Sequence, residues 1–453
     1  YHLKSELSMM NHEHNPVSVR IGKLQEIWFE ETDRNPDYNL ARWVIHTEDV
    51  DFLNGFLKLE STPHGKLADL FVVLFTPFIS EDHFAKALIF DWISMYKTEI
   101  EQQKMPQVWN FSVFEEKVKE LVPEDSGVPM LLEMLEDFSK FSSNHSRPLV
   151  VTLIPRTISE NGIYARFIKK LIAKNQIHTA VKFAILDFAD HHYFVETTTI
   201  SDKKTIDINP GNLNMREAIN QLASQGNQND PQVQFRICML KMGEATGNNS
   251  RKALDEWGKK LLEAAQKSAN QGMWASAHLI YGGFLMHFPA KEETEQMLQK
   301  ALQLSKRAIA EDKNNVTILI QIYGYLGALE SMNGDHKKAL HYFDLQAKTS
   351  VENDLITSAI SSYKTILFLC DQHNYKEEFD SYLQEAYQMG LEIKDEDLKV
   401  SDYSFIAYHF IEENQFTDKE EVAVLNERME RLFGPEWRAE LQYRFDEATA
   451  QRK

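Results

Sequence analysis

The chain has 453 residues and a formal net charge of −19, with 49 Lys and Arg against 68 Asp and Glu. A surface this acidic repels nucleic acid and anionic membranes, which argues against general binding to either. The length exceeds what one hydrophobic core usually holds and predicts two or three domains. The two cysteines, Cys238 and Cys370, stand far apart in apolar surroundings, so no disulfide framework is expected.

The apolar runs of the sequence are too short to span a bilayer, and no signal-peptide pattern precedes them. Together with the cysteine usage, this predicts a cytoplasmic protein with no membrane insertion. We expect residues 1–15 to be a disordered or vector-derived segment, because Met10 follows an opening stretch without helical or strand periodicity.

Short apolar runs alternate with helical stretches of ten or more residues in the N-terminal half. Such runs are typical of strands buried on both faces, and the alternation is typical of a mostly parallel sheet. The fold class predicted for residues 16–230 is therefore a three-layer α/β domain. The expected strands are residues 41–47, 70–75, 148–154, 181–187 and, more weakly, 204–208.

Residues 181–187 form an apolar run that ends in Asp187. The run resembles the second nucleotide motif of P-loop ATPases, and in that family such an Asp holds magnesium. A phosphate loop also needs Gly-x-x-x-x-Gly-Lys-Ser/Thr, whose backbone N–H groups and Lys meet the phosphates. The Gly-Lys pairs at residues 22–23, 65–66 and 258–259 lack both the glycine five positions earlier and the hydroxyl residue after the lysine. The resemblance therefore implies a degenerate P-loop-type domain, and we assign no catalytic residue, cofactor or metal.

Polar side chains follow two of the expected strands at the edge where α/β folds place their sites. Asp187, Asp190 and His191 end or follow one strand, and Arg156 follows another. These four residues could form a small polar cleft. The alternative is that they cap helices and satisfy the backbone of their loops.

Residues 326–343 have the pattern of two antiparallel helices joined by a tight turn. Leu326, Gly327, Gly334, Ala339 and Phe343 stand at the spacing of a tetratricopeptide repeat, and the stretch resembles one. The glycine at the turn suits the positive φ that ends a helix. The resemblance implies a helical hairpin that buries its apolar stripes only against neighbouring hairpins.

Helical periodicity continues on both sides of this stretch, and Gly272, Ala277 and Tyr281 repeat its glycine–small–aromatic spacing. We therefore predict an all-α TPR-like superhelical array over residues 251–453, preceded by a linker helix and loop over residues 231–250. The resemblance implies a groove for a protein or peptide partner. Its expected lining is Tyr281, Tyr325, Tyr363 and Tyr382, and the alternative is that these tyrosines pack between helices.

Three hypotheses of function follow. The first is a non-enzymatic adaptor, scaffold or chaperone, in which the array holds a protein partner and the α/β domain serves for docking. The second is a nucleotide-responsive switch or enzyme with its site at the strand ends. The third is a structural component that forms oligomers or joins a larger assembly.

Overall fold

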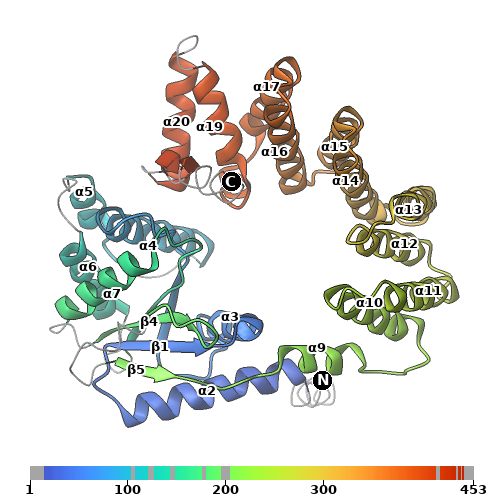
Figure 1. Cartoon of the computed structure of the whole chain (residues 1–453). Helices are drawn as coiled ribbons and strands as arrows, with labels where there is room; N and C mark the ends of the chain where they lie inside the picture. Colours follow the sequence, from blue (N-terminus) through green and yellow to red (C-terminus); the bar gives the residue numbers. More distant parts are fainter. Residues whose placement is uncertain are drawn as a thin grey trace. The chain divides into compact units, whose positions relative to one another are not determined.

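The structure is a computed structural model, shown in Figure 1. It describes residues 15–103, 108–120, 127–142, 148–175, 180–194, 205–414, 419–434, 437–439 and 441–442. The segment 1–15 therefore lies outside the described residues, except for Asn15. The chain forms two compact units, which divide between Leu222 and Ala223.

A five-stranded sheet with the order β2-β3-β4-β1-β5 forms the centre of the first unit. Every neighbouring pair of strands is parallel. The strands are β1 (Leu40–Ile45), β2 (Leu70–Leu74), β3 (Leu149–Leu153), β4 (Val181–Phe188) and β5 (Thr205–Ile208). All residues of β1 and β3 are buried, as continuous apolar runs predict for strands covered on both faces. The parallel α/β fold predicted from the sequence is confirmed.

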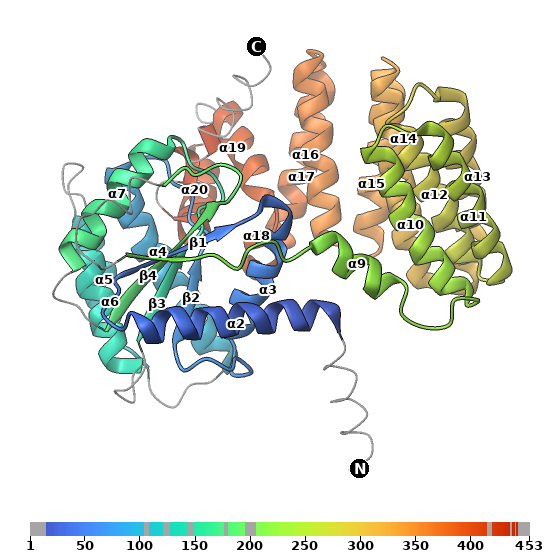
Figure 2. The same ribbon diagram turned by 60° about the horizontal axis from the view of Figure 1, so that its bottom comes forward.

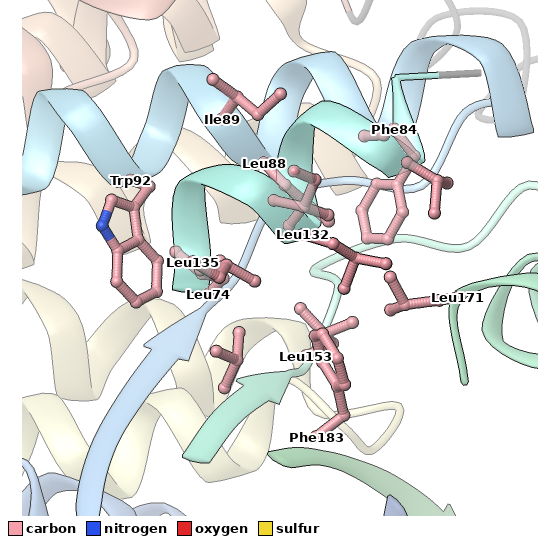
Figure 3. Close-up of a cluster of buried hydrophobic side chains, with 14 of the residues drawn as sticks. Leu74, Phe84, Leu88, Ile89, Trp92, Leu132, Leu135, Leu153, Leu171 and Phe183 are labelled. Carbon is pink, nitrogen blue, oxygen red and sulfur yellow. The ribbon is translucent and has the colours of Figure 1, made fainter. Parts of the chain in front are cut away.

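Helices on both sides of the sheet complete three layers. Each face of the sheet has its own cluster of buried apolar side chains. Along β4, Phe183 and Ile185 belong to the cluster on one face, whereas Ala184 and Leu186 belong to or pack against the cluster on the other. Figure 3 shows part of the first cluster, with Trp92 and its neighbours above the strands. The first face carries α4 (Glu81–Gln103), α5 (Ser112–Glu120), α6 (Val128–Ser142) and α7 (Asn161–Lys174). The second carries α2 (Pro16–Arg34), α3 (Val50–Glu60) and residues of α9 (Met215–Ala223).

The second unit is an array of paired helices, and Figure 2 shows several of them side by side. Its helices are α10 (Pro231–Gly247), α11 (Arg251–Lys267), α12 (Gln271–Leu285), α13 (Lys291–Glu311), α14 (Val316–Met332), α15 (His336–Glu352), α16 (Ile356–Gln372), α17 (Lys376–Glu392), α18 (Asp395–Lys399), α19 (Tyr403–Asn414) and α20 (Lys419–Phe433). The segment expected to be a linker forms α10, which buries Cys238 and Met242 in a cluster shared with α11 and α12. Within the described residues, no helix has the length and apolarity needed to cross a bilayer.

One type of turn recurs through the array. At the end of α14, the N–H of Asp335 donates to the carbonyl of Glu330 at 2.9 Å, and Gly334 between the helices has φ +81°. This is the six-to-one bond that closes a helix around a left-handed residue. The same bond closes the turns at Asn249, Asp354 and Asn374, each of which has a positive φ. In the turn after α11 the left-handed residue is Ala269, and the N–H of Asn270 donates to the Ser268 hydroxyl.

The α14–α15 and α16–α17 hairpins are longer than those of a tetratricopeptide repeat. The helices α14, α15, α16 and α17 each have 17 residues. Because α14 begins at Val316 and α16 at Ile356, these two hairpins start 40 residues apart, compared with about 34 in a tetratricopeptide repeat. The array is therefore TPR-like in its hairpins, with longer helices.

Glycines let the paired helices approach closely. A Cβ on Gly327 of α14 would lie 2.7 Å from the ring of Phe343 in α15. In the earlier hairpin, a Cβ on Gly258 of α11 would lie 2.6 Å from the ring of Tyr281 in α12. The second contact lies about one helical turn farther from the connecting turn than the first.

The structure corrects one equivalence that we drew from the sequence. We matched Gly272 with Gly334, but Gly272 is the second residue of α12. The positive φ before α12 belongs to Ala269, and Asn270 caps the helix by accepting from the N–H of Met273. Spacing alone misplaced the turn by three residues, because Ala269 carries no turn signal of its own.

Candidate functional site

A charged network joins three strands of the sheet. Arg42 of β1 donates to Asp187 of β4 at 3.0 Å and makes two hydrogen bonds, at 2.9 and 2.6 Å, to Asp207 of β5. The Arg42 and Asp187 side chains are buried, and that of Asp207 is 46% exposed. Burial opposes the charge on Arg42, but the hydrogen bonds and charges of the two carboxylates outweigh it and raise the pKa of Arg42.

Both oxygens of Asp187 accept hydrogen bonds from the chain itself. Oδ1 accepts from the N–H groups of Phe188 and Tyr193, each at 2.9 Å. Oδ2 accepts from Phe194 at 3.2 Å and from Arg42. The carboxylate thus fixes the loop after β4 and links it to β1. Its arrangement has the character of a buried structural acceptor, in contrast to the magnesium ligand that the sequence resemblance implies.

The other residues of the predicted polar cleft lie at the surface. Asp190 accepts from the N–H of Thr47 at 3.1 Å and lies 3.2 Å from the ring nitrogen of His46. The Thr47 amide, followed by His46, holds the pKa of Asp190 below its usual range. His191 is exposed on the same loop, and Arg156 is exposed after β3, where its N–H donates to the carbonyl of Phe75.

The helix after β1 begins where a phosphate loop would hold its anion. β1 is followed by a single 3-10 turn, Thr47–Asp49, and then by α3. Asp49 is fully buried, and its carboxylate accepts from the N–H groups of Leu213 and Met215 at 2.7 and 2.9 Å. A carboxylate at a helix N-terminus has the same charge as a phosphate and disfavours one there.

Among the described residues, no group of three or more His, Cys, Asp or Glu side chains is arranged to hold a metal ion. The residues at the strand ends therefore form internal ion pairs and loop contacts.

A hollow of about 620 Å³ lies between three successive helices of the array. Its lining is Val351 of α15, Tyr363 of α16 and Ser381, Gln384, Glu385, Gln388 and Met389 of α17. Tyr363 is buried and its hydroxyl donates to Glu385 at 3.4 Å, whereas Val351 is 40% exposed. We call this feature the α15–α17 hollow, and we take it as the candidate functional site.

Two of the four predicted groove tyrosines belong to this region. Tyr363 lines the hollow, and Tyr382 on α17 is half-buried beside it. Burial, followed by the carboxylates of Asp344 and Glu385, raises the pKa of Tyr382 to about 12. The phenols therefore stand in a negative electrostatic environment.

The other two tyrosines pack against glycines of neighbouring helices. Tyr281 is buried on Gly258, and its hydroxyl donates to Asp255 at 2.7 Å. Tyr325 is 42% exposed, and its ring would lie 2.8 Å from a Cβ on Gly283. The structure thus brings Tyr363 and Tyr382 together and places Tyr281 and Tyr325 elsewhere in the array.

Comparison with known proteins gives little beyond this geometry. No protein-family model matches the chain, and no curated protein matches it. One solved structure that it resembles is a Signal Transduction ATPase with Numerous Domains (STAND) protein with a tetratricopeptide repeat sensor from Pyrococcus horikoshii. The match has 10% identity, covers 92% of this chain and 75% of that one, and has a TM-score of 0.26. So low a score carries no argument, and the fold stated above rests on the structure itself.

Sequence reasoning missed the hollow residues Val351, Gln384, Glu385 and Met389. Glu385 stands three residues after Tyr382, so helical spacing could have placed the two side chains on one face. Val351 lies on α15, and no local pattern connects it to α17. Only the packing of the hairpins brings these helices together.

Proposed function

We propose that this protein is a non-enzymatic adaptor, scaffold or chaperone that binds a protein partner through its TPR-like array. The observation that carries the proposal is the α15–α17 hollow, to which α15 and α17 contribute exposed side chains around the buried Tyr363 of α16. Stacked helix pairs bury their stripes against one another and leave extended surfaces of this kind for a partner.

We propose that the α/β unit serves as a docking module in this function. In support, Asp187 and Asp49 accept hydrogen bonds from the unit's own backbone, and each helps to join its loops to the sheet. These contacts stabilise the unit and leave its outer surface for association.

Affinity purification from the native cell tests the use of the hollow. Gln384 is exposed on the hollow and Gln303 is exposed on α13, so Gln384→Trp fills the site and Gln303→Trp is its matched control. The proposal expects wild type and Gln303→Trp to retain a partner that Gln384→Trp loses. Retention by all three proteins would mean that the partner binds elsewhere, and the lack of any partner would contradict the proposed function.

Calorimetric titration with ATP and GTP, with and without magnesium, tests the non-enzymatic part. We expect no saturable heat. Saturable nucleotide binding that is weakened by Asp187→Ala would instead support a nucleotide-responsive switch at the strand ends.

A further inference from the structure

We propose that the α15–α17 hollow binds a peptide segment that carries an apolar side chain beside Lys or Arg. The inference rests on the proposed function and deepens it, because it names the chemistry of the partner.

The lining supplies an apolar contact. Val351 of α15, Tyr363 of α16 and Met389 of α17 all line the hollow. Val351 leaves 40% of its surface exposed, although it belongs to a helix whose other apolar residues are largely buried. A side chain such as Leu or Met placed here would remove this apolar surface from water, which favours binding.

The charged groups at the walls favour a cation. Glu385 lines the hollow, and Asp344 lies on α15 close enough that both carboxylates raise the pKa of Tyr382. Lys348 pairs with Asp344 at 2.9 Å, so one carboxylate is already partly neutralised. Glu385 is exposed and accepts a hydrogen bond from the Tyr363 hydroxyl. Lys348 lies close enough that the charge of Glu385 helps to raise its pKa, but its hydrogen bond is to Asp344, so Glu385 can still accept hydrogen bonds from Lys or Arg of a peptide.

The negative charge is local to this part of the array. Residues 341–402 contain thirteen acidic and five basic residues, whereas residues 251–307 contain six acidic and nine basic. The hollow therefore lies in a segment that attracts basic peptides and repels acidic ones, and the earlier hairpins do not share this character.

Fluorescence anisotropy with the full chain tests the inference. The probe is a labelled twelve-residue peptide with Leu-Met at its centre, two Arg on each side and Gly and Ser elsewhere. One comparison peptide replaces each Arg by Glu, and another replaces Leu-Met by Ser-Ser. We expect saturable binding of the first peptide only, and a loss of affinity of about tenfold in Glu385→Lys. Glu256→Lys on α11 makes the same change in net charge and should bind as wild type does.

A second variant tests the inference independently, in case Glu385→Lys misfolds. Gln384→Lys with Gln388→Lys adds positive charge at exposed lining positions and keeps the contact between Glu385 and Tyr363. It should also weaken the peptide about tenfold with an unchanged circular dichroism spectrum. Equal affinity in this variant and wild type, an equal loss in Glu256→Lys, or tighter binding of the Glu peptide would each overturn the inference.

Two outcomes separate this inference from the proposed function. A cellular partner that is lost from Gln384→Trp but contacts the hollow through an acidic segment would overturn the inference and leave the proposed function standing. A dimer in light scattering that Gln384→Trp dissociates would show that the occupant is a second copy of the chain, which would also overturn the inference.

Discussion

At the scale of single residues, the tight turns of the array all need a left-handed residue, and the chain meets this need in different ways. Gly334 takes the conformation without steric cost, and Asn249, Asp354 and Asn374 are side chains that tolerate it. Ala269 has φ +54°, but it carries a Cβ, unlike glycine, and lacks the polar side chain that lets Asn and Asp tolerate this conformation. Its turn is therefore the most strained of the five.

We expect Ala269→Gly to raise the free energy of unfolding by roughly 0.5–1 kcal/mol, because glycine removes the clash of Cβ with the backbone. Urea denaturation followed by circular dichroism measures the change. Ala253→Gly, inside α11, is the matched control and should lower the free energy of unfolding by about 1 kcal/mol. A loss of stability in Ala269→Gly comparable to that of the control would contradict the assignment of this turn.

We expect His278 on α12 to make the stability of the fold sensitive to acid. Burial, followed by the nearby Lys300, lowers the pKa of His278 to about 4, and its Nδ1 has no hydrogen-bond partner among the described residues. The unfolded chain binds a proton near pH 6.5 and the folded chain does not, so stability is lost as the pH falls from about 6.5 towards 4. His278→Leu should therefore be less sensitive to acid, by about 1–2 kcal/mol at pH 5.

Urea denaturation at pH 8 and pH 5 checks this prediction, with exposed His287→Leu as the control. Burial also lowers the pKa of His409, so part of the acid sensitivity should remain in His278→Leu. The same difference in stability between the two pH values in wild type and His278→Leu would show that His278 does not contribute.

At the scale of the elements, glycine–aromatic contacts set the distances between helices. Gly390 of α17 lies against the ring of Tyr403 in α19. A Cβ added to Gly390 would overlap a ring carbon of Tyr403, so the ring or the helix would have to move. Gly243 of α10 has no atom within 4 Å of an added Cβ. The two glycines lie in α-helices but have opposite surroundings.

Alanine substitution should therefore change stability in opposite directions at these positions. We expect Gly390→Ala to lower the free energy of unfolding by about 1–3 kcal/mol through overpacking. Gly243→Ala should raise it by up to about 1 kcal/mol, because alanine is the better helix former. Thermal unfolding monitored at 222 nm compares them, and a stabilised Gly390→Ala would contradict the close approach of α17 and α19.

Arg42 of β1 pairs with two carboxylates on neighbouring strands: Asp187 of β4 is buried, and Asp207 of β5 is partly exposed. Asp187→Asn leaves the buried Arg42 without one of its two carboxylates, and we expect a loss of about 3 kcal/mol. Asp207 is 46% exposed, so Asp207→Asn should cost at most about 1 kcal/mol. Urea denaturation of the two variants side by side measures the difference, and equal losses would contradict this description of the network.

At the scale of the whole molecule, the two units have separate hydrophobic cores. Each hydrophobic cluster draws its residues from one unit. We therefore expect residues 223–453, expressed alone, to fold with a helical circular dichroism spectrum and a cooperative thermal transition. Aggregation of this fragment, or a spectrum without helix, would show that the array depends on the first unit.

The sequence by itself determined the order of strands and helices. The continuous apolar run 148–154 identifies a buried strand, because both faces of an interior parallel strand are covered. The similar run 70–75 wrongly predicts a strand inside the sheet: it forms the edge strand β2, and Leu70 and Phe75 are exposed. Gly334 and the apolar stripes around it identify a hairpin, because turn chemistry and helical periodicity are local properties. The missing phosphate loop is likewise readable, since it depends on consecutive residues.

Only the tertiary structure decided the order of strands in the sheet, the acceptor role of Asp187 and the position of the α15–α17 hollow. Asp187 accepts a hydrogen bond from Arg42, which is 145 residues away in the sequence, and Val351 and Met389 line one hollow from different helices. Such contacts depend on how elements pack, which sequence spacing does not encode for residues on different elements. The same reason explains why Tyr363 lines the hollow with Tyr382 beside it, while Tyr281 and Tyr325 pack on the glycines of neighbouring helices.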